Sequence, residues 1–318
     1  MTLFRCRLIQ LALSVIICGA MPAMAAMTVS PLQVSGNKIF PGTRQVNLCG
    51  NSLFWSNSGW GAEKFYNAGS ITDLKKNWHA GIVRAAMGVE DAGGYLTDPR
   101  GNMKRVEVVV DAAIKAGMYV IIDWHSSHAE SYQKEATIFF QGMATRYGQY
   151  PNVIYEIYNE PFKVSWKNTI RPYAIAVISA IRKKDPDNLI IVGTPNWSQD
   201  VDVAAQAPLG GKNIAYAFHF YAGTHGQPFR NKVLTALQHG LPVFVTEWGA
   251  VNADGNGPVN VQETATWIRF LNTYKISYVN WAYNDKAEGT STFLPGTHSL
   301  SASGRTVINI DRACPGQP

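Results

Sequence analysis

The feature that most constrains the fold of this 318-residue chain is a regular alternation of short apolar segments with helical patterns. The segments are rich in β-branched and aromatic residues, as strands are, and the stretches 106–116 and 171–184 between them carry apolar residues at helical spacing. Eight strands are predicted, at 46–48, 81–85, 119–122, 153–157, 189–192, 214–218, 243–246 and 278–281. Strand and helix repeated in this way predict an α/β fold with a parallel sheet.

An open, doubly wound sheet shares this alternation, so the position of the polar residues decides between the two. Polar side chains follow nearly every predicted strand, and active sites of barrel enzymes lie at the carboxyl ends of the strands. We therefore predict a closed (β/α)8 TIM barrel, with residues 28–39 as a short N-terminal β-hairpin at its lower mouth. We expect one catalytic domain over 27–318 and no appended carbohydrate-binding module, because no Ser/Thr/Pro-rich linker interrupts the sequence.

Residues 1–26 have the composition of a secretory signal peptide. Arg5 and Arg7 precede an apolar stretch at 8–21, and Ala-Met-Ala at 23–25 is a small-residue cleavage site. The apolar stretch is shorter than the ~20 residues that a membrane-spanning helix needs. We therefore expect a soluble, monomeric protein that is secreted to the periplasm or the extracellular space and has no membrane partner after cleavage.

Charge and residue spacing argue against nucleic acid and metal as partners, and the cysteine content raises the question of a disulfide. Removing Arg5 and Arg7 lowers the formal net charge from +6 to +4 (6 − 2), and no basic run follows a helix, so nucleic acid is not an expected partner. No cysteine, histidine or acidic spacing is typical of a metal site. Cys49 and Cys314 invite a disulfide in an exported protein. However, Cys49 is expected at the exit of the first strand and Cys314 at the opposite face, which disfavours a bridge.

Two predicted strands lead directly into a glutamate. The segment 154–161 reads Ile-Tyr-Glu-Ile-Tyr-Asn-Glu-Pro and contains Glu160, and 241–249 reads Leu-Pro-Val-Phe-Val-Thr-Glu-Trp-Gly and contains Glu247. Either acid alone could be structural. Glycoside hydrolysis uses two carboxyl groups, one to protonate the leaving oxygen and one to attack or to activate water. The pair therefore predicts glycoside hydrolysis.

Further polar and aromatic residues lie at the same strand ends. Arg84, inside the second predicted strand, needs a carboxylate partner, which is either a structural one such as Glu156 or a catalytic glutamate that it keeps ionised. Tyr221 could hydrogen-bond the same catalytic carboxylate. We predict contacts with the substrate or the catalytic acid for His125, Asn159 and His219. Indole rings can stack on sugars, and a majority of five is expected to line a groove: Trp55, Trp124, Trp197, Trp248 and Trp281.

Six segments in this order resemble one enzyme family. They are Val-Arg-Ala-Ala-Met at 83–87, Ile-Asp-Trp-His at 122–125, Tyr-Glu-Ile-Tyr-Asn-Glu-Pro at 155–161, His-Phe-Tyr-Ala at 219–222, Val-Thr-Glu-Trp-Gly at 245–249 and Asn-Trp-Ala-Tyr-Asn-Asp-Lys-Ala-Glu at 280–288. Over essentially the whole chain after residue 26, the sequence is similar to the bacterial endoglucanase subfamily of the glycoside hydrolase family 5 cellulases.

The resemblance implies hydrolysis of internal bonds of β-1,4-glucan with retention and without a cofactor. Glu160 would be the acid/base and Glu247 the nucleophile. It also implies a group around the cleaved sugar, namely Arg84, His125, Asn159, His219, Tyr221 and Trp281. Trp197 matches an aromatic platform, and Lys286 and Glu288 match contacts to glucose on the non-reducing side. Many relatives carry His-Gly-Leu-Gln-Trp where this chain has Asn51-Ser52-Leu53-Phe54-Trp55. The histidine that supplies a sugar contact there is replaced by Asn51, while Trp55 aligns with the tryptophan of that segment.

Two alternative functions remain open at this point. A related barrel could act on mannan, xylan or mixed-linkage glucan, because the catalytic glutamates do not select the polymer. Lys286 and Glu288 favour cellulose. A catalytically silent carbohydrate-binding barrel belongs to a different class, and the presence of both glutamates together with Arg84 argues against it.

Overall fold

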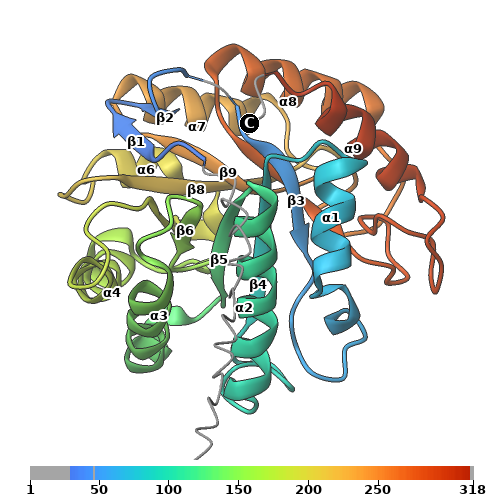
Figure 1. Ribbon diagram of the computed structural model, residues 1–318. Coiled ribbons are helices and arrows are strands. Elements are labelled where there is room, and N and C mark those ends of the chain that lie inside the picture. The colour runs from blue at the N-terminus through green and yellow to red at the C-terminus, as the bar shows by residue number, and fades with distance from the viewer. Residues whose placement is uncertain (1–28, 46, 316–318) are drawn as a thin grey trace, which may run out of the picture.

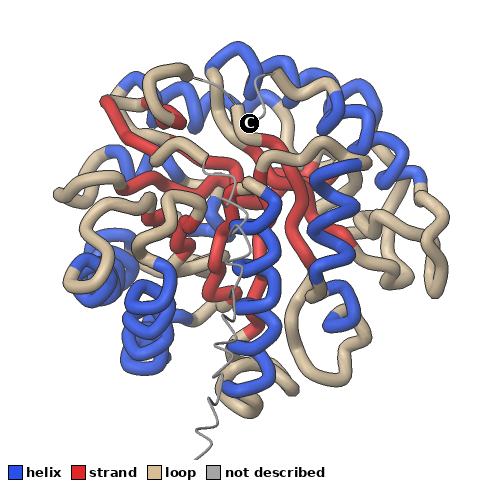
Figure 2. Tube along the Cα trace, viewed as in Figure 1, coloured by secondary structure: helices blue, strands red, loops and turns tan. Residues whose placement is uncertain are grey.

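The computed structural model describes residues 29–45 and 47–315, which form a closed barrel of parallel strands inside a layer of helices (Figures 1 and 2). The barrel strands are β3 (Cys49–Leu53), β4 (Ile82–Gly88), β5 (Tyr119–His125), β6 (Val153–Glu156), β7 (Ile190–Val192), β8 (Ile214–Tyr221), β9 (Val243–Gly249) and β10 (Tyr278–Tyr283). Each pairs with the next, and β10 pairs with β3 to close the ring. The predicted (β/α)8 barrel is confirmed, while the predicted signal peptide lies outside the described residues.

The helices begin and end where the sequence provides caps. Asn67 caps the first helix, Asp98 followed by Pro99 begins the second, and Gly117 in the left-handed region (φ 63°) ends it. The helices are α1 (Ala68–Lys76), α2 (Pro99–Ala116), α3 (Gln133–Tyr147), α4 (Arg171–Arg182), α5 (Pro195–Ser198), α6 (Val201–Ala205), α7 (Gln227–Gln238), α8 (Val261–Tyr274) and α9 (Ala302–Arg312), with short turns η1 (Glu63–Phe65), η2 (Ala129–Tyr132) and η3 (Trp166–Ile170). Within the described ranges, no helix is both long enough and apolar enough to cross a membrane.

A two-stranded hairpin covers the mouth of the barrel at which the strands begin. It consists of β1 (Leu32–Ser35) and β2 (Lys38–Pro41), which pair antiparallel. The side chain of Asn213, directly before β8, accepts a hydrogen bond from the Val34 N–H at 2.9 Å and donates one to the Leu32 carbonyl at 3.1 Å. The hairpin predicted at 28–39 is present with its strands at 32–35 and 38–41, and the opposite mouth is left for the site.

The barrel interior has an apolar half and a charged half. Alternate residues of a strand face inward, and Ile82, Tyr119 and Ile154 belong to one buried cluster with hairpin residues. Two positions further along β4 and β6, the corresponding residues are Arg84 and Glu156, both fully buried. The charged groups are therefore stacked above the apolar half, toward the carboxyl ends of the strands.

The first barrel strand begins at Cys49, so the predicted strand at 46–48 was placed too early. Cys49 consequently lies at the start of β3 and not at its exit. Helix α9 runs back along the barrel and ends at Arg312, which brings Cys314 to the same end. The two cysteines form a disulfide with a Cα–Cα distance of 6.3 Å. The prediction that disfavoured this bridge was wrong. It placed the strand at 46–48 and therefore assigned Cys49 to the wrong end of the barrel.

Replacing Cys314 with Ser is expected to lower the free energy of unfolding by about 2–4 kcal/mol, because the bridge limits the entropy of the unfolded chain. The bridge joins residues 265 positions apart in the sequence. Urea unfolding measures the effect, and a reductant should destabilise the parent protein while leaving Cys314→Ser unchanged. Equal stability of the oxidised parent and the variant would contradict a stabilising bridge.

Candidate active site

The structure brings Glu160 and Glu247 together at the open mouth of the barrel. One carboxylate oxygen of each lies, together with a ring nitrogen of His219, in a group whose atoms are all within 4.8 Å of one another. Both glutamates border a cavity of about 330 Å³. The cavity is lined by Glu160, Trp197, Gln199, His219, Tyr221, His225, Glu247 and Ala253.

Arg84 is the buried cation on which this site is built. Its Nε lies 2.6 Å from Glu156 Oε2, and its Nη1 lies 3.0 Å from Glu247 Oε2. Its Nη2 donates to Asn159 Oδ1 at 2.7 Å and lies 2.9 Å from Asp123 Oδ2. The two partners that the sequence left open are therefore both present, because one guanidinium offers five N–H donors in a fixed plane.

Glu247 is held through both of its carboxylate oxygens. Arg84 binds Oε2, and the Tyr221 hydroxyl donates to Oε1 at 2.7 Å. Gly249 makes room for this arrangement, since a Cβ at that position would lie 2.3 Å from a carbon of the Tyr221 ring. The carboxylate thus has a fixed orientation and a positive counter-charge.

His125 and His219 differ in charge state. Burial and the charge of Arg84 lower the pKa of His125 to about 3, and its Nδ1 lies 2.7 Å from Asp123 Oδ2. Burial also acts against a charged His219, but nearby Glu156 and Glu160 outweigh it and raise the pKa of His219 to about 9. At neutral pH, therefore, His125 is neutral and His219 is an imidazolium, 2.9 Å from Glu160 Oε1.

Three of the five candidate tryptophans lie at the mouth of the barrel, and two do not. The Trp281 ring is stacked on His125 at 5.1 Å, and Trp55 meets the same imidazole edge-on at 4.3 Å. Trp197 borders the cavity. Trp124 and Trp248 are fully buried and pack against other aromatic rings. Three of five is the majority that was expected, and Trp124 and Trp248 point to the helix layer because each follows an inward-facing residue.

The backbone around Trp197 is unusual. Asn196, Trp197 and Ser198 have φ values of 58°, 57° and 56°, a region that non-glycine residues seldom adopt. The Ser198 hydroxyl donates to the Asn159 carbonyl at 2.7 Å, which ties this strained turn to the residue beside Glu160. Backbone strain of this kind concentrates at functional sites. The turn thus holds the Trp197 indole at the cavity wall.

Lys286 and Glu288 form an ion pair of 2.8 Å on the side of the mouth near Trp281. The Lys286 ammonium lies 4.9 Å from the centre of the Phe54 ring, which itself packs against Trp281 at 5.2 Å. Asn51 is fully buried and donates to Asp311 on α9 at 2.6 Å. Asn51 thus faces the helix layer and not the mouth of the barrel.

Sequence reasoning missed some residues of the site. Asp123 and Glu156 were not named as site residues, although both lie two positions after an inward-facing apolar residue, so the period-two pattern could have found them. Thr246 was not considered either, although it lies two positions after Phe244 of the same apolar cluster, so the same pattern directs it inward. Three cavity-lining residues carried no signal: Gln199, His225 and Ala253.

Glu160, His219 and Glu247 could in principle hold a metal ion, since their ligand atoms are close together. Both ring nitrogens of His219, however, are engaged, Nδ1 with Glu160 and Nε2 with Thr246 Oγ1 at 2.8 Å. The trio therefore offers no free imidazole ligand.

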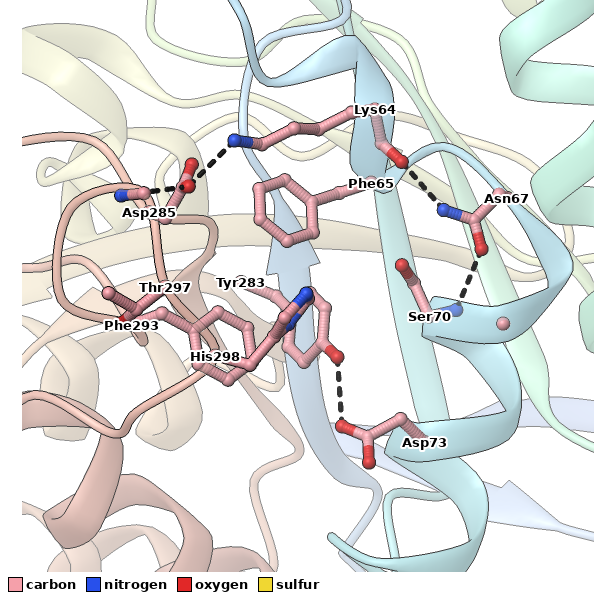
Figure 3. A pocket seen from close by; sticks show the side chains of 12 residues that line it. Lys64, Phe65, Asn67, Ser70, Asp73, Tyr283, Asp285, Phe293, Thr297 and His298 are labelled. Carbon is pink, nitrogen blue, oxygen red and sulfur yellow. Dashed lines mark hydrogen bonds and ion pairs between the residues drawn. The ribbon is translucent and has the colours of Figure 1, made fainter.

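A second cavity, of about 660 Å³, lies between α1 and the loop at 285–298 (Figure 3). Its carboxylates are already paired: Asp285 with Lys64 at 2.6 Å, and Asp73 with the Tyr283 hydroxyl at 2.8 Å. Neither Glu160 nor Glu247 borders it. The cavity that Glu160 and Glu247 border is therefore the candidate active site, although it is the smaller of the two.

Comparison with known proteins identifies a family to which this chain is similar. The model of the family "Cellulase (glycosyl hydrolase family 5)" matches residues 35–287. The chain is 60% identical to endoglucanase Z of Dickeya dadantii over 91% of this chain and 68% of that protein, and 46% identical to an endoglucanase of Clostridium saccharobutylicum over 73% and 53%. It thus spans about half to two thirds of the length of these relatives.

Solved structures of cellulases have a similar fold. The catalytic domain of Thermobifida fusca endoglucanase Cel5A is 33% identical, covers 89% of this chain and 97% of its own, and has a TM-score of 0.83. A variant of that domain has been solved in complex with cellotetraose. The match of the family model over most of the chain, on a barrel of the same fold, shows that this protein belongs to glycosyl hydrolase family 5, the cellulase family.

Proposed function

We propose that this protein is an endo-β-1,4-glucanase that cleaves with retention of anomeric configuration, Glu247 being the nucleophile and Glu160 the acid/base. The observation that carries the mechanism is the proximity of the two carboxylates, whose nearest oxygens lie within 4.8 Å. Retaining enzymes have carboxyl groups ~5–5.5 Å apart, whereas inverting enzymes need ~6.5–9.5 Å to admit a water molecule. The short separation supports direct attack on the sugar.

The surroundings of each glutamate support this division of roles. Glu247 is paired with Arg84 and Tyr221, which leaves it an oriented anion. In the first step a Glu247 oxygen bonds to the anomeric carbon, the glycosidic C–O bond breaks, and Glu160 gives its proton to the departing oxygen. In the second step Glu160 takes a proton from water, the water oxygen bonds to the anomeric carbon, and Glu247 leaves. Two inversions give net retention.

The placement of the aromatic residues supports cleavage within a chain. Trp55 follows β3 and Trp197 follows β7, and these two strands are opposite each other in the eight-strand ring. A glucan that contacts both rings would cross the mouth above the two glutamates and extend on either side. Asn159 is oriented for the cleaved sugar: its Oδ1 accepts from Arg84, and its Nδ2, which lies 3.5 Å from His125 Nε2, has a second hydrogen to donate to a hydroxyl group.

A substrate panel tests the proposed specificity. Carboxymethyl cellulose, mannan, xylan and mixed-linkage glucan are hydrolysed in parallel, and both viscosity and reducing ends are measured. We expect a fast loss of viscosity relative to reducing ends on carboxymethyl cellulose. Strong activity on mannan or xylan with none on the cellulose derivative would contradict the proposed substrate, while leaving the roles of the glutamates to be tested separately.

We further propose that the protein is exported. The disulfide between Cys49 and Cys314 supports this, because such bonds persist in oxidising compartments. Detection of the bridge, and of a mature chain beginning near residue 27, in material from outside the cytoplasm would test the proposal. A reduced, uncleaved chain confined to the cytoplasm would contradict it.

A further inference from the structure

Thr246 has no part in the mechanism above, yet its hydroxyl lies between Glu156 and His219, inside the barrel. Neighbouring residues of a strand normally face opposite sides, so the residue before an inward-facing Glu247 should point outward. The pairing of β8 with β9 is irregular here, since the interval from Ala217 to His219 corresponds to the longer interval from Phe244 to Glu247. The extra residue in β9 is a bulge, a device that redirects a side chain. Thr246 and Glu247 therefore both face the interior.

The Thr246 hydroxyl joins two groups of the site. Its Oγ1 lies 2.6 Å from Glu156 Oε1 and 2.8 Å from His219 Nε2. Burial alone would raise the pKa of Glu156, but Arg84, His219 and Thr246 lower it to about 2, so Glu156 is an anion and can only accept. The Thr246 hydroxyl must therefore donate its single hydrogen to Glu156, and its oxygen must accept a hydrogen bond from His219 Nε2–H.

This arrangement fixes which nitrogen of His219 titrates. Nε2 keeps its proton because Thr246 can only accept from it. The titrating atom is then Nδ1, which lies 2.9 Å from Glu160 Oε1. When His219 is charged, its Nδ1–H donates to Oε1, so the other oxygen of Glu160 is left for the substrate.

We propose that Thr246 and Glu156 are positioning residues, which keep Nε2 of His219 protonated and its Nδ1–H directed at Glu160. This proposal rests on the role of Glu160 as acid/base. The charged ring stabilises the carboxylate that forms when Glu160 gives its proton to the leaving sugar. The proton count of the reaction is unchanged, because Glu160 loses one proton and regains it from water while His219 keeps both of its own.

The charges around His219 come from several strands. Glu156 and Glu160 face it from β6 and the residues after it, and Glu247 faces it from β9; together they raise the pKa of the ring against the effect of burial. Asp123 and His125 on β5 also interact with its charge, Tyr221 and His225 border the same cavity from β8 and the loop after it, and Arg84 on β4 is paired with Glu156. Of all these charged groups, Glu156 is the one that the Thr246 hydroxyl connects to Nε2 of His219.

Glu156 also links the two halves of the site. Its Oε2 accepts from Arg84 Nε at 2.6 Å, and the same guanidinium holds Glu247 at 3.0 Å. One buried carboxylate thus connects the cation of the proposed nucleophile with the histidine of the proposed acid. Replacing Glu156 would disturb both halves, whereas replacing Thr246 breaks the link on the side of Glu160 and leaves the pair of Arg84 and Glu247 in place.

The test replaces Thr246 with Val, which keeps the shape of the side chain and removes the hydroxyl. We expect the His219 ring to lose its charge at lower pH than in the parent, because Nε2–H has lost its acceptor. We also expect the neutral ring to change from the Nε2–H to the Nδ1–H tautomer. Nitrogen-15 NMR of the histidine rings measures both quantities, with the His219 signal identified by its loss in His219→Gln. On glucan, kcat should fall about tenfold with little change in KM.

Two further variants complete the test. Thr246→Ser restores the hydroxyl and should restore the parent titration and tautomer. Thr194→Val removes another buried hydroxyl, which donates to the Ala217 carbonyl on β8 at 3.1 Å, and should leave His219 unchanged. If Thr246→Val does not fold, Thr246→Ala replaces it. An unchanged titration and tautomer in the variant without the hydroxyl, failure of Ser to restore them, or the same change in Thr194→Val would each overturn the proposal. The NMR readout needs no turnover, so a parent enzyme inactive on glucan would refute the proposed function separately.

Discussion

Replacing Glu247 with Ala is expected to lower kcat on β-1,4-glucan by about 10⁴-fold or more. Arg84 and the Tyr221 hydroxyl hold the Glu247 carboxylate at the cavity that Glu160 also borders. Among the described residues that line this cavity, there is no third carboxylate to replace it. Initial rates of reducing-end release from carboxymethyl cellulose measure the loss. Binding of cello-oligosaccharides, measured by calorimetry, should survive, since the change removes the nucleophile and leaves the aromatic walls of the cleft.

Azide distinguishes a missing nucleophile from a damaged fold. In Glu247→Ala, azide can occupy the space of the lost carboxylate, attack the anomeric carbon from the same face and restore turnover, giving an α-glycosyl azide. His298→Ala is the matched control, because His298 lines the second cavity and should leave the rate unchanged. Full activity of Glu247→Ala, or loss of activity in His298→Ala, would place the chemistry elsewhere.

Replacing Glu160 with Ala is expected to lower kcat on glucan by about 10³-fold, which is within the range of a lost general acid. The effect should depend on the leaving group. A cellobioside with a dinitrophenolate leaving group needs no protonation, so formation of the glycosyl-enzyme should be almost as fast as in the parent. Hydrolysis of that intermediate should be slow, because the base that activates water is absent. Stopped-flow release of dinitrophenolate should therefore show a burst followed by a slow steady state.

Azide again provides a control for Glu160→Ala. Azide needs no general base, so it should accelerate the slow phase and give a β-glycosyl azide, the opposite anomer from that of Glu247→Ala. An equal loss of rate with good and poor leaving groups would contradict the role of Glu160 as acid/base. The same anomer of azide product from both variants would contradict the division of roles.

The architecture could be predicted from the sequence because two independent signals agreed. Apolar segments alternated with helical patterns, and polar residues collected at the ends of those segments, as at Asp123 and His125 or at Glu247. The boundaries were less certain. The short apolar run at 46–48 resembles a strand, but pairing with β4 and β10 places β3 at 49–53. Register is a property of neighbouring strands, and that error alone reversed the inference about Cys49.

The charged residues of the candidate site could be predicted from their positions in the sequence. The aromatic residues were harder to predict, because their role depends on which side of the strand they face. Arg84 is costly to bury inside a strand without a charged partner, and Glu160 and Glu247 form a pair at two strand ends, so their sequence positions were informative. A tryptophan can serve either the cleft or the core, and only the alternation along the strand separates Trp281 from Trp248. The alternation along β9 points Thr246 inward, because it lies two positions after Phe244 of the inner apolar cluster. It could not show that the adjacent Glu247 faces inward too, since that depends on the bulge in β9, which appears only when β8 and β9 are paired.

The most direct test of retaining cleavage by Glu160 and Glu247 is the anomeric configuration of the first product. Proton NMR follows the parent enzyme on a cello-oligosaccharide and records the new reducing end before the two anomers equilibrate. Double displacement through Glu247 predicts that the β anomer appears first and that the α anomer grows later by mutarotation. Initial appearance of the α anomer would show a single displacement by water and would contradict the assignment of Glu247 as nucleophile.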